Sequence, residues 1–427
     1  MTPEVKQRIE QIRQGIVPEG YKKTKSGILP ENWSVRTIAE CLERVEHPVE
    51  VQANEMYTQI GIRSHGKGLF YKEPVTGDSL GNKAVFWIEP DCFILNIVFA
   101  WEQAIGKTTQ AEAGMIGSHR FPMYHPINGS IDIDYLISYL LTKRGTDILE
   151  AASPGGAGRN RTLGQDRFMK SRIVLPPLDE QKKIAEILTT QDKAIELQGR
   201  KIEELKRFKQ GCLERMFPRK GQKVPEKRFP GFSGDWEQRK VSDLLVERNE
   251  QAPMSDEYPL MAFIANEGVA PKGERYDRSS LVNDAAGKLY KKTEFGDFIY
   301  SSNNLETGSI GLNKYGNACI SPVYSIFQPT GLADSDFIGR RFVRKDFINA
   351  MVKWRQGVIY GQWKIHESDF LKIEVSVPSV EEQRKIGAFL DHLDNLITLH
   401  QRKLEEMKKQ KKALMQLLLT GIVRVSA

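Results

Sequence analysis

Two long stretches of the chain carry apolar residues at alternating spacings of four and three. The first series is Ile184, Leu188, Ile195, Ile202 and Leu205, with glutamine at 191 and 198. The second is Ile386, Leu390, Leu393, Ile397, Leu404 and Met407, with histidine at 400. This spacing is typical of a coiled-coil seam, where polar interruptions cost stability but fix the register. We therefore expect two helices of about 40 residues and roughly 60 Å each.

The same short sequence precedes both helices. It reads LPPLDEQ at 175–181 and VPSVEEQ at 377–383. Proline is tolerated at the first turn of a helix, and acidic residues there are favoured by the helix dipole. Because one chain carries the seam twice, mutual antiparallel packing is the simplest way to bury both stripes. The alternative, in which each helix pairs with another protein, stays open at this point.

The repeated unit is larger than the helix. ENWSVRTIAECL at 31–42 pairs with GDWEQRKVSDLL at 234–245, which aligns two tryptophans. Before each proline, Phe168 aligns with Phe370, and each phenylalanine is expected in a short strand that runs into the proline. Each unit therefore has a tryptophan at its start, a variable middle and a long helix at its end.

The middles, 46–165 and 248–366, share only a loose rhythm. Short β-type runs alternate with Gly, Asn and Pro turns, and helical stretches follow, so each middle predicts a compact globule of mixed sheet. The predicted fold class is α+β, with two globular mixed α/β domains separated by two long antiparallel coiled-coil helices and an internal pseudo-two-fold repeat. The predicted segments are an N-terminal helix region packing near the distal coiled coil (1–19), a first domain (20–177), a first long helix (178–219), a second domain (220–379) and a second long helix (380–427).

Composition narrows the class of protein only modestly. The net charge of +7 permits nucleic-acid binding, but a merely basic protein fits that charge as well. The four cysteines are scattered without a CxxC pair, which favours reduced thiols and a cytoplasmic protein over a disulfide framework or zinc site. No apolar run approaches the ~20 residues of a membrane span, and the charged N-terminus has no signal-peptide core. We expect no membrane association.

Two similar domains with different interiors, held apart by rigid helices, suit a linear polymer with a regular repeat. Duplex DNA repeats its major groove every ~34–36 Å, a distance that a helical spacer of this order can bridge. The matched ends would keep the scaffold, and the divergent middles would carry two different sequence preferences.

At this point the chain resembles the specificity subunit of type I restriction–modification enzymes. The resemblance rests on the two proline junctions, the tryptophans at 33 and 236, GYKKTKSGILPENW at 20–33 and RFPGFSGDW at 228–236. It covers essentially the whole chain, as two target-recognition domains alternating with two helices. One departure is Ser379, where the family usually has a second proline.

The resemblance implies partners and a division of labour. Such a subunit reads a split sequence in double-stranded DNA, one half per domain, and docks two modification (methyltransferase) subunits through its helices. Those subunits methylate adenine with S-adenosylmethionine, and added restriction subunits use ATP and Mg²⁺ to translocate and cut DNA. The resemblance therefore implies a non-catalytic chain that holds no cofactor or metal of its own.

Three motifs that could indicate chemistry are weak. GIRSHGKG (61–68) has phosphate-loop spacing, but glycine stands where a Ser or Thr would hold Mg²⁺. SPVY (321–324) faintly resembles the adenine-methyltransferase tetrad but has valine in place of a proline, and GGAGRN (155–160) lacks the third glycine of a dinucleotide fingerprint. The histidines show no metal-ligand spacing with cysteine or carboxylate. We expect no catalytic or metal site.

Basic, amide and hydroxyl side chains in Gly-flanked loops, with one tryptophan, are the candidates for DNA contact, since Lys and Arg bind phosphates and Arg, Asn, Gln, Lys and Ser read base edges. In the first domain they are Arg63, Ser64, His65, Lys67, Lys107, Thr108, Thr109, Arg159, Asn160 and Arg161. In the second they are Asn266, Lys272, Arg275, Asn303, Asn304, Gln362, Trp363 and Lys364. For each, a solvated turn residue is the competing interpretation.

Two other classes of function stay open from the sequence. A protein–protein scaffold would carry two divergent modules on a coiled coil, without salt-sensitive DNA binding. A nuclease would cut DNA alone with a divalent metal, but the sequence lacks the carboxylate clusters that this needs.

Overall fold

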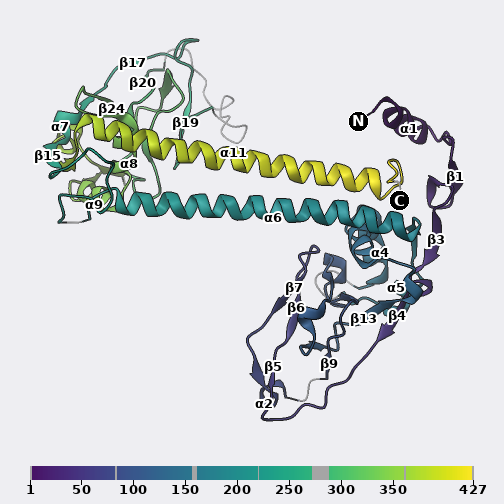
Figure 1. Cartoon of the computed structure of the whole chain (residues 1–427). Coiled ribbons are helices and arrows are strands. Elements are labelled where there is room, and N and C mark those ends of the chain that lie inside the picture. Colours follow the sequence, from purple (N-terminus) through teal and green to yellow (C-terminus); the bar gives the residue numbers. More distant parts are fainter. Residues whose placement is uncertain are drawn as a thin grey trace. The chain divides into compact units, whose positions relative to one another are not determined.

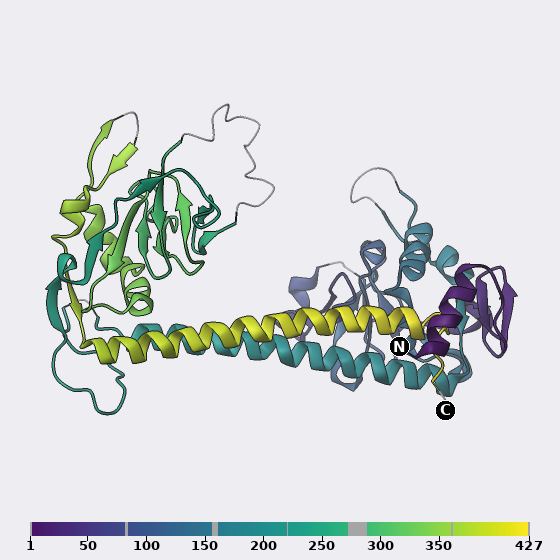
Figure 2. The ribbon, with the colours of Figure 1, turned by 90° about the horizontal axis from the view of Figure 1, so that it is seen from above.

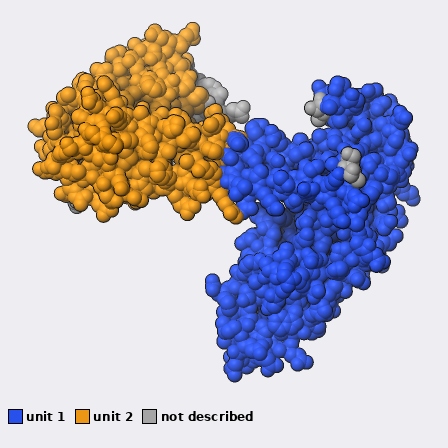
Figure 3. All heavy atoms as spheres, in the orientation of Figure 1, with its two compact units in different colours: residues 1–199, 403–427 blue, residues 200–402 orange. Residues whose placement is uncertain are grey.

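The computed structural model describes residues 2–81, 84–155, 161–219, 221–271, 288–359 and 362–425. They form two compact units, one of residues 1–199 with 403–427 and one of residues 200–402 (Figure 3). Each unit therefore joins one globular domain to parts of both long helices. The predicted segment boundaries stay a prediction.

The first unit runs from helix α1 into the first part of α6 and also takes in the last part of α11 (Figure 1). Its helices are α1 (Pro3–Arg13), η1 (Ile38–Glu40), α2 (Gly77–Leu80), η2 (Ala100–Glu102), η3 (Gln110–Glu112), η4 (Ile127–Gly129), α3 (Ile133–Leu140), α4 (Lys143–Ala152), α5 (Gln165–Lys170) and α6 (Leu178–Arg215). Its strands are β1 (Tyr21–Thr24), β2 (Gly27–Pro30), β3 (Ser34–Thr37), β4 (Leu42–Val45), β5 (Met56–Tyr57), β6 (Ile60–Ile62), β7 (Leu69–Tyr71), β8 (Val75–Thr76), β9 (Val85–Trp87), β10 (Phe93–Leu95), β11 (Ile105–Lys107), β12 (Ile116–Ser118), β13 (Met123–Pro126) and β14 (Arg172–Leu175).

The second unit follows the same plan. Its helices are α7 (Val241–Leu244), α8 (Ser335–Phe342), α9 (Lys345–Val352), α10 (Glu367–Phe370) and α11 (Val380–Leu418). Its strands are β15 (Glu237–Lys240), β16 (Leu245–Glu247), β17 (Gln251–Ala252), β18 (Ala262–Ile264), β19 (Gly268–Ala270), β20 (Tyr290–Thr293), β21 (Phe298–Tyr300), β22 (Ile310–Leu312), β23 (Ala318–Ile320), β24 (Ser325–Pro329), β25 (Gln356–Ile359), β26 (Gln362–Lys364) and β27 (Glu374–Val377).

Each domain is built on a four-stranded antiparallel sheet with the same strand order. The order is β11-β10-β13-β4 in the first unit and β22-β21-β24-β16 in the second. The registers agree too, since Phe93 faces Tyr124 and Phe298 faces Phe327. The predicted internal repeat and mixed α/β domains are thus confirmed. The predicted mixed sheet was wrong, because every strand pair among the described residues is antiparallel and parallel pairing is limited to two isolated bridges.

The matched ends of the repeated units pair with each other. Strand β3 after Trp33 pairs antiparallel with β14, and β15 after Trp236 pairs with β27. Both tryptophans are buried. The strand prediction for Phe168 and Phe370 was wrong, because they lie in α5 and α10 and the strands begin later. Their helices turn the rings into the core, where Phe168 stacks on Phe93 at 6.1 Å between ring centroids and Phe370 on Phe298 at 6.0 Å.

Helices α6 and α11 lie side by side and antiparallel (Figures 1 and 2). In the first unit, Lys411 pairs with Asp192 at 2.5 Å; in the second, Lys209 pairs with Asp394. From the first pair to the second, the residue number rises along α6 (192 to 209) and falls along α11 (411 to 394), as antiparallel packing requires. The predicted seam is confirmed, because its residues, among them Ile184, are buried or half-buried all along both helices.

The N-terminal helix α1 is tied to the segment that follows α11. Arg8 donates a hydrogen bond from Nη1 to the Ile422 carbonyl at 2.6 Å, and the Tyr21 hydroxyl donates to the Gly421 carbonyl at 2.6 Å. In the part of the chain that the structure describes, no helix is long and apolar enough to span a bilayer.

Candidate nucleic-acid interface

One glutamine anchors each domain to its long helix. Gln181, in the first turn of α6, accepts from the Asp132 backbone N–H at 2.9 Å and donates to the Pro176 carbonyl at 2.9 Å and the Ser130 carbonyl at 3.5 Å. Asp132 caps α3, so the Gln181 side chain fixes the start of α6 against the start of α3.

The second unit repeats this arrangement atom for atom. Gln383 accepts from the Asp334 backbone N–H at 3.0 Å and donates to the Pro378 and Leu332 carbonyls at 3.0 and 3.1 Å. Asp334 caps α8, as Asp132 caps α3. The glutamine of the repeated junction is therefore a structural crosslink, which explains why the same short sequence stands before both helices.

The glutamate before each glutamine is buried and bound by arginine. Glu180 accepts two hydrogen bonds from Arg424, both at 2.7 Å, and one from the Trp33 indole at 3.1 Å. Glu382 accepts two from Arg228, at 2.7 and 2.6 Å. Arg424 follows the end of α11 and Arg228 follows the end of α6, so the sequence around each glutamate gave no signal of its partner.

Each domain also has a cleft beside its central sheet. The cleft of the first unit encloses about 360 Å³ and is lined by Ser64, Phe70, Lys72, Asn96, Glu102 and Phe121, among others. The cleft of the second encloses about 750 Å³ and is lined by Asn249, Lys291, Asn303, Tyr324, Trp363 and Glu367, among others. Amide, basic and acidic groups beside aromatic rings are suited to contacting nucleic-acid bases and phosphates.

The predicted loop at 63–67 lies at the first cleft. Ser64 lines it and donates to Glu102 at 3.0 Å. Arg63 donates to the Leu69 carbonyl at 2.5 Å, and its guanidinium lies 5.1 Å from the centre of the Phe70 ring. His65 adopts a left-handed backbone conformation with φ +61°, and Lys67 is exposed. The loop is thus held firmly while its basic side chains reach solvent.

The predicted loop at 107–109 is engaged within the domain. Lys107 forms an ion pair with Asp134 at 2.8 Å; burial opposes its positive charge, but that carboxylate still raises its pKa. Thr108 is fully buried and donates to the Glu89 carbonyl at 2.6 Å. Thr109 caps η3. DNA contact by these three stays a prediction, although all three side chains already have partners inside the domain.

Some predicted contacts lie outside the described residues. These are Arg159, Asn160, Lys272 and Arg275. The same holds for the side chain of Gln362, although its backbone lies in β26. Arg161 is described, and its guanidinium lies 5.3 Å from the centre of the Trp101 ring.

The second cleft brings together predicted residues that are far apart in sequence. Asn303 accepts from the Trp363 backbone N–H at 2.6 Å, and Lys364 is exposed on the same strand. Asn304 is exposed near them but does not line the cleft, and Asn266 holds its backbone in the left-handed region at φ +64°. The sequence placed Asn303 and Trp363 in separate loops, and only the fold shows them as neighbours.

The second cleft also contains residues that the sequence analysis missed. Lys291 comes from β20, Glu367 from the first turn of α10, and Tyr324 from the turn before β24. Lys291 lies inside a strand rather than a loop, so its place in the sequence gave no signal of DNA contact. Tyr324 stood in the weak SPVY motif, where it was assigned to strand and turn.

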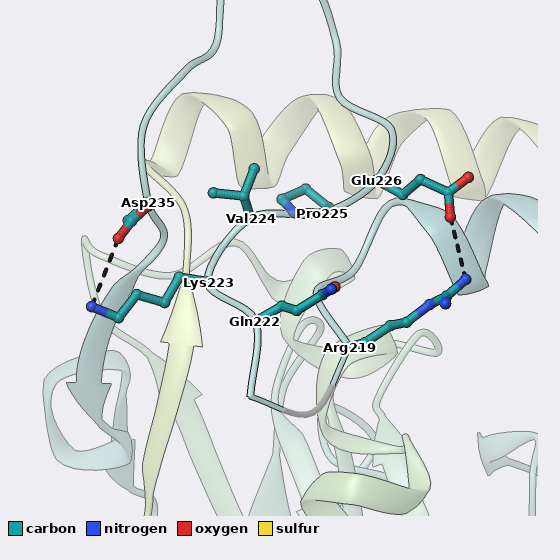
Figure 4. Close-up of a pocket in the computed structure, with 7 residues that line it drawn as sticks. All are labelled: Arg219, Gln222, Lys223, Val224, Pro225, Glu226 and Asp235. Atoms are coloured by element: carbon teal, nitrogen blue, oxygen red, sulfur yellow. Dashed lines mark hydrogen bonds and ion pairs between the residues drawn. The ribbon is translucent and has the colours of Figure 1, made fainter.

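A third hollow lies in the linker after α6 (Figure 4). It encloses about 440 Å³, and its charged side chains pair with one another. Lys223 lies 3.7 Å from Asp235, and Arg219 lies 3.3 Å from Glu226. These pairs leave the hollow with balanced charge, so it is a weaker candidate for binding an anionic polymer than the two clefts.

The thiols are poorly suited to chemistry. Burial raises the pKa of all four, and that of Cys92 reaches about 12. A thiol is nucleophilic as the thiolate, which these environments disfavour. Among the described residues, no group of three His, Cys, Asp or Glu side chains is placed to hold a metal ion.

Known proteins resemble this chain along nearly its whole length. It is 24% identical to the MjaX specificity subunit of a type I restriction enzyme, as that protein of Methanocaldococcus jannaschii is described, over 95% of this chain and 97% of that one. It is also 24% identical to the type I restriction enzyme MjaVIII specificity subunit of the same organism, over 97% and 98%.

Solved structures share the fold. The S subunit of a type I restriction–modification system from M. genitalium superposes with a TM-score of 0.52 at 14% identity, over 91% of this chain and 96% of that one. A chain from a structural study of assembly in a type I system superposes with a TM-score of 0.51 at 16% identity, over 92% and 99%.

The model of one protein family matches twice, once in each repeated unit. It is described as the type I restriction modification DNA specificity domain, and it matches residues 86–207 and 233–409, which is more than half of the chain. The two matches agree with the duplicated sheet, junction and long helix. The chain therefore belongs to the family of type I restriction–modification DNA specificity domains.

Proposed function

We propose that this chain gives a type I restriction–modification complex its DNA sequence preference, with each domain reading one half of a split site. The observation that carries the proposal is a scaffold kept identical while the interiors differ. Gln181 and Gln383 make the same three hydrogen bonds, yet the two clefts differ twofold in volume and carry different side chains. Selection for one frame and two surfaces is what a reader of two different sequences requires.

The long helices set the gap between the half-sites and dock the modification subunits. Their seam is occupied by their mutual packing, so a partner must bind elsewhere on them. Large apolar side chains point away from the seam: Leu197 is 64% exposed on α6, and Leu399 is 62% exposed on α11. Exposed leucines on otherwise charged helix faces are suited to partner contacts.

The chain itself is non-catalytic and resides in the cytoplasm with its partners. The two modification subunits supply S-adenosylmethionine-dependent methylation of adenine in double-stranded DNA. The restriction subunits supply ATP- and Mg²⁺-dependent translocation and cleavage. Family membership supports these assignments.

The DNA-binding surface includes the two clefts and the loops beside them. In the first domain, Lys67 and Arg161 provide phosphate contacts and Ser64 lies at the reading cleft. In the second domain, Asn303, Trp363 and Lys364 line the reading cleft. Lysine and arginine give affinity through phosphates, whereas groove-facing polar groups give preference among bases.

The test is selection of bound duplexes from a randomised DNA library by the purified complex with modification subunits, at moderate salt. The proposal predicts one enriched motif with two specified halves and an unspecified gap. Affinity should fall steeply with salt concentration, because phosphate neutralisation releases counterions. A complex that assembles but enriches no motif would favour a protein–protein scaffold instead.

A further inference from the structure

The two clefts occupy the same place in the repeated fold. Asn96 and Asn303 each lie just after the second strand of the central sheet, β10 or β21. Phe121 and Tyr324 each precede the third strand, β13 or β24. The cleft recurs at one position of the repeated fold, so the fold itself forms it. The side chains that line it differ between the two units.

The cleft of the second unit contains a buried lysine whose charge is not compensated by direct contacts. Lys291 is only 7% exposed, in the middle strand of the β17-β20-β23 sheet, with Gln251 opposite it. Within the described residues, its ammonium makes no hydrogen bond or ion pair. Because Lys291 lines the cleft, its N–H donors are available to an acceptor on a ligand that enters there.

An ionised carboxylate lines the same cleft. Glu367 accepts a hydrogen bond from the Ser325 hydroxyl at 2.8 Å. Burial raises the pKa of Glu367, but the Ser325 hydrogen bond, with help from Lys364 and Lys291, outweighs burial and lowers it. The cleft therefore carries a hydrogen-bonded carboxylate and a lysine ammonium among its lining groups.

The strands at the rim give the cleft access to a duplex. Hairpin β25–β26 stands out from the body of the second unit (lime green in Figure 2) and carries Trp363 and Lys364 into the lining. Trp363 is 45% exposed, and its backbone is held by Asn303. A two-stranded ribbon fits the major groove, which would bring base edges to the foot of the hairpin.

We propose that Lys291 and Glu367 read one G·C base pair in the second half-site, with the Lys291 ammonium donating to guanine O6 and N7 and the Glu367 carboxylate accepting from cytosine N4. This inference rests on the proposed function. Guanine presents two adjacent acceptors in the major groove, and cytosine presents a single donor. Lys291 and Glu367 supply such a donor and acceptor from one cleft, and other polar residues of its lining, Lys364, Glu247, Asn249 and Gln251, remain for neighbouring bases.

The test compares Lys291→Met with wild type in the complete complex, again by library selection. Methionine keeps the buried aliphatic volume and removes the ammonium. We expect preference for G·C at one position of the second half-site to fall on the order of 10- to 100-fold, because one base contact is lost. The first half-site should be unchanged.

The matched control is Lys292→Met on the same strand. This neighbour does not line the cleft, and its ammonium lies 4.4 Å from the centre of the Tyr258 ring and 3.9 Å from Glu250. It removes the same charge from the same unit, so it should leave every base preference intact. If Lys292→Met changed the same position equally, a general charge effect would replace the proposed contact.

A second variant, Glu367→Gln, tests the same base pair from its other side and serves if Lys291→Met fails to fold. It should weaken the preference at the same position as Lys291→Met. A wild-type complex without any split motif overturns the proposed function. If the wild type has a split motif that both variants leave unchanged, the cleft assignment alone is overturned. A uniform loss of affinity for all sequences would also overturn it, because it marks a phosphate contact. Loss of preference at an A·T position would overturn it as well.

Discussion

Arg228 and the carboxylate of Glu382 form a fork of two parallel hydrogen bonds, donated from Nε to Oε1 at 2.7 Å and from Nη2 to Oε2 at 2.6 Å. Glu382 is fully buried. Arg424 and Glu180 form the same fork in the first unit. Each fork ties the segment after one long helix to the first turn of the other. These two ion pairs therefore stabilise the two junctions where a domain meets its long helix.

Breaking one fork should destabilise its unit strongly. Arg228→Met leaves the Glu382 charge buried and unpaired, which costs about 3–5 kcal/mol of unfolding free energy. Urea unfolding measures this. The control is Lys223→Met, whose exposed pair with Asp235 is worth at most about 1 kcal/mol. Equal losses of unfolding free energy in the two variants would show that the Arg228 ion pair contributes no more to stability than an exposed pair.

The junction glutamine can be tested alone. Gln383→Leu removes three hydrogen bonds and strands the Asp334 N–H, which should cost about 2–3 kcal/mol of stability. Gln401→Leu, at an exposed position on the same helix, should cost less than about 0.5 kcal/mol. Denaturant midpoints of the two variants give the comparison, and a loss confined to Gln401→Leu would contradict the assignment.

The seam offers a matched pair of identical substitutions. Leu188 is fully buried in α6, whereas Leu197 on the same helix is 64% exposed. Leu188→Ala should lower the unfolding free energy by about 2–5 kcal/mol, and Leu197→Ala should leave it nearly unchanged. If Leu197 instead contacts a modification subunit, Leu197→Ala should weaken assembly of the complex, which analytical ultracentrifugation would detect.

Acid should weaken the helix pair of the second unit through Asp394. Burial raises the pKa of this carboxyl, but hydrogen bonds from Lys209 and Arg340 outweigh burial and hold it below its usual 3.8. A lowered folded pKa means that the stabilisation is complete above the usual value and is lost as pH falls through the folded value. Unfolding free energy measured from pH 6 down to about pH 3 should therefore fall less steeply for Asp394→Asn than for wild type, while the exposed Asp256→Asn should follow wild type.

Lys67 tests the proposed phosphate contacts of the first domain. Lys67→Gln should weaken binding about equally for all sequences and reduce the slope of log affinity against log salt by about 0.9. Lys6→Gln, on α1, removes the same charge and should leave the slope unchanged. Binding titrations at several salt concentrations measure both, and a change of base preference in Lys67→Gln would assign the residue to readout instead.

The scaffold was predictable from the sequence because its sequence pattern occurs twice in the chain. The spacing of Ile184 and Leu188, repeated at Ile386 and Leu390, predicts the seam, and its repetition within one chain predicts antiparallel packing. The partners of Glu180 and Glu382 were not predictable. Arg424 and Arg228 reach them from segments whose lengths differ, so no sequence alignment places them together.

The site was predictable only in part. Choosing basic, amide, hydroxyl and aromatic residues in glycine-flanked loops found Ser64, Asn303, Trp363 and Lys364 at the clefts. The same rule chose Thr108, whose hydroxyl serves the core, because residue type does not reveal which loop face is exposed. It missed Lys291, since a strand residue reaches a cleft only through the packing of separate sheets.

The central claim, two domains reading two half-sites, is tested most directly by mapping methyladenine in the DNA of cells that express this chain with its modification subunit. The account predicts a single split motif that carries methyladenine, with both halves and the gap defined, and that disappears when this chain is deleted. Methylation that persists unchanged after the deletion would contradict it.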